Sequence, residues 1–410
     1  MKGTGRLAAA GLLLALAAAC GPAAHHEGPT GRSASSPPPA TSTAPSGGAS
    51  TAPASPGPPS HTAATVAWPD VTTVPHLFYH SLVVDPARAF TGSRQGIGFS
   101  QYMVSVSEFT KQLEQIHENG WVLVHPQDLA APGPDGTMTR KRLMLPAGKK
   151  PLVLSIDDVS YYEYMKGKGF ASKLVIAPDG RVRNTYVDAA GREQVGAFDV
   201  VPIVDDFVRA HPDFSHNGAK GTIALTGYNG ILGYRTSARE YGDNATTRKE
   251  QASAKAVAAA LKGEGWNFAS HTWGHINMTS SSLERVKADS GRWDREVRPL
   301  VGDTPLLVYP FGADIAGVEK YSTRNAKFSY LHGREEFSYF FNVDASRTHW
   351  MQLTSHAMRQ ARINVDGMTM QRTLSGRTTV LDGFFDTKST VDPARPLPVP
   401  GGAGPVPGGG

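Results

Sequence analysis

Residues 152–158, Leu-Val-Leu-Ser-Ile-Asp-Asp, decide the fold of this chain, because they join a strand-like apolar run to two adjacent carboxylates. An uninterrupted apolar run of this length is typical of a strand buried inside a parallel sheet. In such sheets ligands bind beyond the carboxyl ends of the strands, which is where Asp157 and Asp158 stand. We therefore expect a functional site there, with one carboxylate holding a metal and its neighbour a proton.

A second stretch, residues 270–275, has the sequence Ser-His-Thr-Trp-Gly-His and follows another strand-like run at 266–269. Its two imidazoles, His271 and His275, stand four residues apart, so both can reach one ion if the loop turns or winds helically. With Asp158 they complete an Asp/His/His set, which is typical of catalytic zinc. The two stretches together predict the metal site of a hydrolase.

Strand and helix patterns alternate around these stretches and predict an α/β domain with a largely parallel sheet. A helix is expected from Ser105, where Glu108 completes a capping box. Residues 173–195 predict a β-hairpin insertion around a Pro-Asp-Gly turn, whereas the region after Gly312 looks irregular. Further strands are expected at 74–80, 121–124, 221–226 and 306–309, and further helices near 201–208, before 263 and from 282.

Residues 1–20 have the features of a secretory signal, with Lys2 and Arg6 before a short apolar run and small residues before Cys20. Cys20 is the single cysteine of the chain and stands where a bacterial lipoprotein is cleaved and lipidated. Lipidation there would anchor the protein to a membrane, and ordinary secretion is the alternative. The single cysteine also excludes intrachain disulfides and cysteine catalysis, and no Gly-x-Ser-x-Gly motif supports a serine hydrolase.

Composition divides the remaining chain into a globular domain at 67–395 and two flanking segments. Residues 21–66 are rich in Pro, Ala, Ser and Thr, and residues 396–410 in Pro and Gly, which predicts a disordered linker and a disordered tail. A linker of this kind suits a domain held outside the cytoplasm, away from a membrane surface. The formal net charge of +5 on 410 residues is too mild to indicate a nucleic-acid partner.

Three motifs resemble those of the polysaccharide deacetylases of the NodB-homology type, carbohydrate esterase family 4. Residues 155–159, Ser-Ile-Asp-Asp-Val, resemble the family's Thr-Phe-Asp-Asp-Gly. Residues 271–275 are similar to its His-Ser/Thr-x-x-His, with both ligand positions kept. Residues 308–312, Val-Tyr-Pro-Phe-Gly, resemble its Arg-x-Pro-Tyr-Gly but lack the Arg that orients the catalytic Asp. The resemblance implies a distorted (β/α) barrel.

A pair on the first strand, Tyr79-His80, resembles the exported poly-N-acetylglucosamine deacetylase branch, which also lacks that Arg. In this branch the early His acts as the general acid, which makes His80 the expected proton donor. His332, His349 and His356 are weaker candidates in the irregular region. Arg359 and Arg362 are the candidates to replace the missing Arg.

The resemblance implies a role for each site residue. Asp158, His271 and His275 would hold a divalent ion, most simply zinc, although cobalt, nickel or manganese also suit this set. Asp157 would take a proton from the attacking water. The segment Tyr309, Pro310 and Phe311 would meet the substrate, with the backbone N–H of Phe311 at the oxyanion.

The implied reaction is removal of N-acetyl groups from N-acetylglucosamine-containing polysaccharide, either peptidoglycan or exopolysaccharide, with release of acetate. Two other functions stay open. The same constellation would hydrolyse O-acetyl esters, and the missing Arg together with Val159 in place of Gly would also suit a glycan-binding surface lipoprotein without activity. The sequence does not determine the polymer or the oligomeric state.

Overall fold

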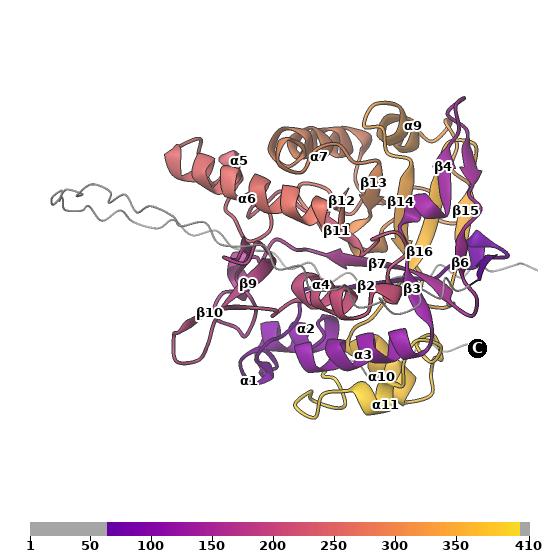
Figure 1. Ribbon diagram of the computed structural model, residues 1–410. Coiled ribbons are helices and arrows are strands. Elements are labelled where there is room, and N and C mark those ends of the chain that lie inside the picture. Colours follow the sequence, from indigo (N-terminus) through magenta and orange to yellow (C-terminus); the bar gives the residue numbers. More distant parts are fainter. Residues whose placement is uncertain (1–63, 402–410) are drawn as a thin grey trace, which may run out of the picture. The chain divides into compact units, whose positions relative to one another are not determined.

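A computed structural model describes residues 64–401, and these contain a closed barrel of seven parallel strands surrounded by helices (Figure 1). Pairing between β7 and β11 closes the ring. The expected distorted (β/α) barrel is therefore confirmed. Around the barrel the strands follow the order β11 (Thr222–Leu225), β12 (Asn267–Ser270), β13 (Leu306–Val308), β14 (Tyr339–Val343), β16 (Met358–Asn364), β2 (His76–Tyr79) and β7 (Lys150–Asp157).

Helices cover the outside of the barrel, with α3 and α4 on one side and α6 and α7 on the other in Figure 1. Two further strands join the same sheet: β3 (Trp121–Leu123) pairs with the start of β7, and β15 (Met351–Leu353) runs antiparallel to β16. The helices are α1 (Pro86–Ala89), α2 (Arg94–Tyr102), α3 (Val106–Glu118), α4 (Val200–Ala210), α5 (Ala238–Tyr241), α6 (Ala245–Gly263), α7 (Leu283–Glu296), α8 (Arg298–Val301), α9 (Ala326–Gly333), α10 (Gly367–Leu374) and α11 (Thr387–Thr390).

The start of α3 follows directly from its sequence. Ser105 Oγ accepts a hydrogen bond from the N–H of Glu108, and the Glu108 carboxylate accepts one from the N–H of Ser105, which is the predicted capping box. The apolar stripe that follows, Phe109, Leu113 and Ile116, is buried in the same cluster as Leu77 and Tyr79 of β2. This stripe fixes α3 against the outer face of the barrel.

Alternation along the strands separates the inside of the barrel from the outside. Leu77 and Tyr79 face the helices, so the alternate residues of the strand, His76 and Phe78, face inward. The interior is filled by one apolar cluster with contributions from most strands, including Val153, Ala224, Ala269, Val308, Phe341 and Met358. Because the interior is packed, the carboxyl ends of the strands are left as the place for a site.

The insertion at 173–195 is an antiparallel sheet, as predicted, with a third strand added. It consists of β8 (Lys173–Ile176), β9 (Val182–Val187) and β10 (Glu193–Gly196), and lies at the left of Figure 1. Two small two-stranded sheets pair β1 (Thr65–Ala67) with β6 (Met144–Pro146) and β4 (Ala130–Pro132) with β5 (Met138–Arg140).

The prediction of an irregular region after Gly312 is wrong. That region supplies two barrel strands, β14 and β16. β16 places Arg359, Gln360 and Arg362 in its middle, and all three are buried. Because a strand with buried charges has no apolar run, sequence periodicity does not reveal it.

The predicted signal at 1–20, the lipidation of Cys20, and nearly all of the predicted linker lie outside the described residues, as do residues 402–410. The structured region begins and ends slightly beyond the expected limits of 67 and 395, since Thr65–Ala67 form β1 and Val399 is buried. In addition, Gln101 Nε2 donates to the Pro400 carbonyl over 2.7 Å. Within residues 64–401, no helix is both long and apolar enough to cross a membrane.

A buried ion pair ties the end of the domain to α3, and it leads to a stability prediction. Arg395 donates to both carboxylate oxygens of Glu108, at 2.6 and 2.5 Å, and both side chains are fully buried. Arg395→Gln would leave the Glu108 charge without its partner and lower the free energy of unfolding by about 3–5 kcal/mol. Urea denaturation measures this. The control Arg377→Gln changes an exposed side chain and should shift the value by less than about 0.5 kcal/mol.

Candidate active site

The structure brings Asp157 and Asp158 at the end of β7 together with His271 and His275 after β12. The Nε2 atom of His271 lies 4.0 Å from Asp158 Oδ1, and that of His275 lies 3.9 Å from Asp158 Oδ2. One ligand atom from each of Asp158, His271 and His275 lies within 4.8 Å of the others, close enough to share one ion. The two adjacent aspartates thus meet the two histidines at the carboxyl end of the barrel.

Residues with a strained backbone occur in all three motifs. Asp158, Thr272, His275 and Phe311 have φ values of 62°, 58°, 49° and 59°, in the left-handed region that side chains other than glycine rarely adopt. Such conformations persist where the surrounding structure enforces them, and they cluster at functional sites. The strain falls on residues from three separate motifs, which marks this end of the barrel as the site.

Asp157 is held by Arg362 through two parallel hydrogen bonds. Arg362 Nη1 donates to Asp157 Oδ1 over 2.7 Å and Nη2 donates to Oδ2 over 2.8 Å. Burial alone would raise the pKa of Asp157, but the charge of Arg362, followed by that of His271, holds it well below its usual value. Asp157 is therefore an ionised carboxylate in a fixed orientation. Of the two candidates to replace the missing motif Arg, Arg362 is the one that contacts Asp157.

A chain of polar side chains inside the barrel positions Arg362. Its Nη1 also donates to Ser155 Oγ over 3.1 Å, and Ser155 Oγ lies 2.9 Å from His76 Nε2. The ring of His76 continues to Gln360 Oε1 at 3.1 Å, and the Arg362 guanidinium lies 4.0 Å over the Phe78 ring. Because the members are buried and bonded to one another, the network restricts the orientation of the Arg362 guanidinium.

Asp158 has a different environment from its neighbour. Tyr162 donates its hydroxyl hydrogen to Asp158 Oδ1 over 2.6 Å. Burial opposes ionisation, yet the nearby His275 and His271 leave the pKa of Asp158 below its usual value. His271 Nδ1 lies 2.9 Å from the Val308 carbonyl, so it donates there and turns Nε2 towards the carboxylates. A metal-binding His and Asp commonly carry second partners of this kind, so the donor set fits a divalent ion.

Asp289 of α7 holds the loop that carries the two histidines. Its Oδ1 accepts from the N–H of Trp273 over 2.6 Å, and its Oδ2 accepts from the N–H of Gly274 over 2.9 Å. The carboxylate is buried, and both of its oxygens accept from these two amides, which lie between His271 and His275 in the sequence. Asp289 thus fixes the separation of the two imidazoles.

His80 lies with this site, as expected for the first strand. Its charge contributes to the lowered pKa values of Asp157 and Asp158, and it also acts on the buried Asp366. Among the described residues, His80 Nδ1 is a buried ring nitrogen without a hydrogen-bond partner. A ring that is close to both aspartates and free on one nitrogen can transfer a proton.

The three weaker histidine candidates do not reach the site. His356 precedes the first residue of β16, at the opposite end of the strand from Asn364. The ring of His332 lies 5.5 Å from that of His356, and the exposed His349 acts on Asp70, before the start of β2. His332 and His356 lie near the amino-terminal end of the barrel strands, and His349 lies on the exposed segment before β15.

The segment 309–311 reaches the site only in part. Phe311 is 59% exposed, and its ring meets that of His275 edge-on at 4.4 Å. The hydrogen bonds of this turn are donated by Gly312 and Ala313, which leaves the N–H of Phe311 for another acceptor. Gly312 has φ of 64° and a Cβ there would meet Val343, so glycine is required.

The expected substrate contact by Tyr309 does not hold for its side chain. Tyr309 is fully buried, and its hydroxyl lies 2.7 Å from that of Tyr321 in the cluster beneath α9. The reason is strand alternation, because Val308 faces the barrel interior and Tyr309 therefore faces outward. Pro310 is also buried. These two residues place the backbone of Phe311.

Sequence reasoning missed Tyr162 and Asp289 and left Arg362 as one of two candidates. The alternation of Gln360, Arg362 and Asn364 is the available signal, since a polar stripe on one face of a strand indicates an inward polar network. Tyr162 follows Asp158 by four residues, but nothing in its spacing distinguishes it. Asp289 becomes visible only when α7 is packed against the histidine loop.

Together the structure shows a (β/α) barrel with paired carboxylates and paired imidazoles at the carboxyl end of its strands. Residues 197–328 match the family model described as polysaccharide deacetylase. This part of the chain is therefore similar to a polysaccharide deacetylase domain, in agreement with the resemblance of the sequence motifs. The match includes His271, His275 and Phe311, and the structure adds Asp157 and Asp158, which precede the matched range.

The comparisons with curated proteins and with solved structures add little to the family match. No curated protein matches the chain. Among solved structures, the chain is similar to the Streptococcus pyogenes deacetylase PplD in complex with acetate, at 15% identity and a TM-score of 0.37, over 76% of this chain and 99% of that chain.

The role of Asp289 is testable through metal affinity. Asp289→Ala removes both acceptors for the histidine loop, so the imidazoles lose their fixed separation. We expect zinc affinity at the Asp158 site to fall by about 10–100-fold. Equilibrium dialysis against zinc measures it, and Asp294→Ala, on the same helix, is the control. Equal affinity in both variants would contradict the positioning role.

Proposed function

We propose that the protein is an exported, metal-dependent deacetylase that removes N-acetyl groups from N-acetylglucosamine-containing polysaccharide and releases acetate. The observation that carries the proposal is the different treatment of the two adjacent aspartates. Asp157 is paired with Arg362, whereas Asp158 faces His271 and His275. Amide hydrolysis needs this division, because one carboxylate must accept a proton while another group activates the water.

Asp158, His271 and His275 would hold the ion, and zinc is the best match for two imidazoles and one carboxylate. When bound, the ion would lower the pKa of a water molecule and polarise the substrate carbonyl. Cobalt, nickel or manganese would suit the same ligands. Tyr162 and the Val308 carbonyl hold two of these ligands in the orientation that binding needs.

Asp157 would accept the proton of the attacking water. The two hydrogen bonds from Arg362 occupy one lone pair on each of its oxygens, so each oxygen keeps another to accept from water. Asp157 Oδ2 lies 3.8 Å from His271 Nε2, so the carboxylate borders the ligand set. Arg362 prevents Asp157 from turning into the ligand set itself.

The remaining steps fall to His80 and Phe311. The N–H of Phe311 would donate to the oxyanion that forms when water adds to the amide carbonyl. His80, as the imidazolium, would give its proton to the glucosamine nitrogen as the C–N bond breaks. Acetate and the free amine of the sugar are the products.

Location and polymer are also part of the proposal. The signal-like residues 1–20 and Cys20 support export with a lipid anchor, and the Pro-rich stretch after them supports a stalk. A domain on such a stalk would reach peptidoglycan or a secreted poly-N-acetylglucosamine. O-acetylated polysaccharide is the alternative substrate class, since the same residues could attack an ester.

Acetate release from N-acetylglucosamine oligomers tests the reaction. The purified protein should release acetate, lose this activity on chelation and regain it with zinc or cobalt. Asp157→Asn and His80→Gln should each lower the rate by about 10²–10⁴-fold, the usual contribution of a positioned base or acid. His356→Gln is the matched control, because this imidazole lies away from the site.

The possible outcomes separate the open alternatives. If acetate is released from O-acetylated glycans and not from N-acetylated ones, the protein is an esterase and not an amidase. Binding of acetylated glycans without acetate release under any metal would leave only a binding function.

The pairing of Arg362 with Asp157 gives a further prediction. In Arg362→Lys one ammonium replaces the two-pronged guanidinium, so Asp157 loses its fixed orientation. We expect kcat to fall by about 10²-fold, as for a misplaced catalytic group. Arg359→Lys is the control, since Arg359 is equally buried on the same strand but pairs with Asp314. It should lose stability without a comparable loss of rate in the folded fraction.

A further inference from the structure

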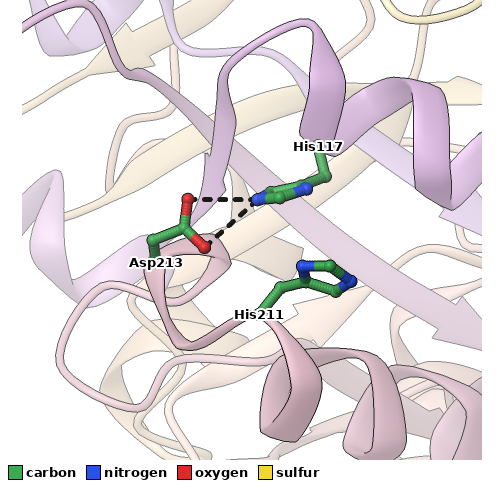
Figure 2. Close-up of side chains that lie close together, drawn as sticks. All are labelled: His117, His211 and Asp213. Carbon is green, nitrogen blue, oxygen red and sulfur yellow. Dashed lines mark hydrogen bonds and ion pairs between the residues drawn. The ribbon is translucent and has the colours of Figure 1, made fainter.

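A second group of metal-ligating side chains lies away from the active site, at the ends of α3 and α4 (Figure 2). His117 belongs to the last turn of α3, His211 is the C-cap of α4, and Asp213 lies in the short helix η4 (Pro212–Phe214). One ligand atom from each lies within 4.8 Å of the others. This cluster, the His117 cluster, plays no part in the proposed reaction.

The two imidazoles of the cluster are held by aromatic packing. The His117 ring meets Phe207 and Phe214 edge-on, each at 5.6 Å, and lies 4.7 Å from the His211 ring. His211 in turn lies 4.5 Å from Phe207. Side chains that are already fixed lose little rotamer freedom when they bind an ion, so the cluster has the character of a built site.

Electrostatics at the cluster favours a cation. The carboxyl ends of two long helices, α3 and α4, meet here, and each carries partial negative charge. Asp213 adds a full negative charge, and both of its oxygens lie within 3.2 Å of His117 Nε2. In this structure the positive charge next to Asp213 comes from Lys149, whose Nζ lies 2.7 Å from Asp213 Oδ2. The Asp213 carboxylate thus contacts both a lysine and a histidine, and it remains partly exposed to solvent.

We propose that His117, His211 and Asp213 form a second site for a divalent transition metal of the zinc class. Two imidazole nitrogens and one carboxylate oxygen suit zinc, nickel or cobalt and leave a position for water. The ion would take the place of the proton that His117 Nε2 shares with Asp213. Bound there, it would link α3 to the connection between α4 and β11.

The proposed site is remote from the Asp158 site. Lys149 immediately precedes β7 and Asp158 immediately follows it, so the eight residues of the strand separate the two. At the rise of an extended strand this is about 25 Å. The second ion would therefore act on the stability of the helical layer and not on the reaction, and the inference does not depend on the proposed function.

Counting bound zinc tests the inference. Equilibrium dialysis with elemental analysis is done on the purified protein and on a variant that lacks the first site, Asp158→Asn with His271→Gln and His275→Gln. We expect two zinc ions in the wild type and one in this variant. Adding His117→Gln and His211→Gln should remove the remaining ion. The adjacent His25 and His26 are changed to Ala throughout, to exclude binding by this pair.

Controls and contrary outcomes are clear. Adding His332→Gln and His356→Gln instead should leave one ion, since these rings form a pair 5.5 Å apart in the same domain without belonging to a three-ligand group. A first-site variant that binds no zinc, or one whose ion survives loss of His117 and His211, would overturn the inference. If the first-site variant does not fold, His117→Gln and His211→Gln are introduced into the wild type instead. They should then lower the number of bound zinc ions from two to one.

Lys149 distinguishes a metal site from a cluster of ion pairs. In the first-site variant, Lys149→Gln frees an oxygen of Asp213 and should raise the affinity for zinc about three- to fivefold, the strength of a surface ion pair. Zinc should also raise the melting temperature of that variant. Unchanged or weaker affinity would show that Asp213 is not a ligand.

Discussion

The ion pair between Arg362 and Asp157 is the interaction on which the site depends. It joins β16 to β7 across the inside of the barrel, and both strands also pair with β2, which ends directly before His80. An unpaired carboxylate buried at this depth would be strongly disfavoured, so Arg362 makes it possible for two aspartates to stand side by side. Asp157 Oδ2 also lies 3.8 Å from His271, but Asp158 is the aspartate that lies near both His271 and His275. One buried arginine thus gives two identical neighbours different surroundings, which is the basis of the proposed division of roles.

The sequence was sufficient for the parts of the fold that follow local rules. The strand before Asp157, the capped helix from Ser105 and the strands before His271 and Tyr309 all have apolar patterns or caps, and the structure contains each of them. The grouping of Asp158, His271 and His275 was also predictable, because the carboxyl ends of neighbouring parallel strands meet at one end of a barrel. The grouping of these side chains therefore followed from motif order and strand ends.

The features that the sequence did not predict are those determined by tertiary packing. β16 carries buried arginines that only the interior network of His76, Ser155 and Gln360 makes stable, so its sequence resembles a loop. Tyr309 belongs to a motif but faces outward, since the preceding Val308 faces inward. Asp289 and Tyr162 act on the site through partners that are distant along the chain or unremarkable in spacing. Contacts of this kind can be recognised only in the folded structure.

The most direct test of this account is the structure of crystals soaked with zinc, with the ion located by its anomalous scattering. The account predicts an ion at Asp158, His271 and His275, with both oxygens of Asp157 still bonded to Arg362. An ion bound by Asp157, with Arg362 displaced, would contradict the division of roles between the two aspartates.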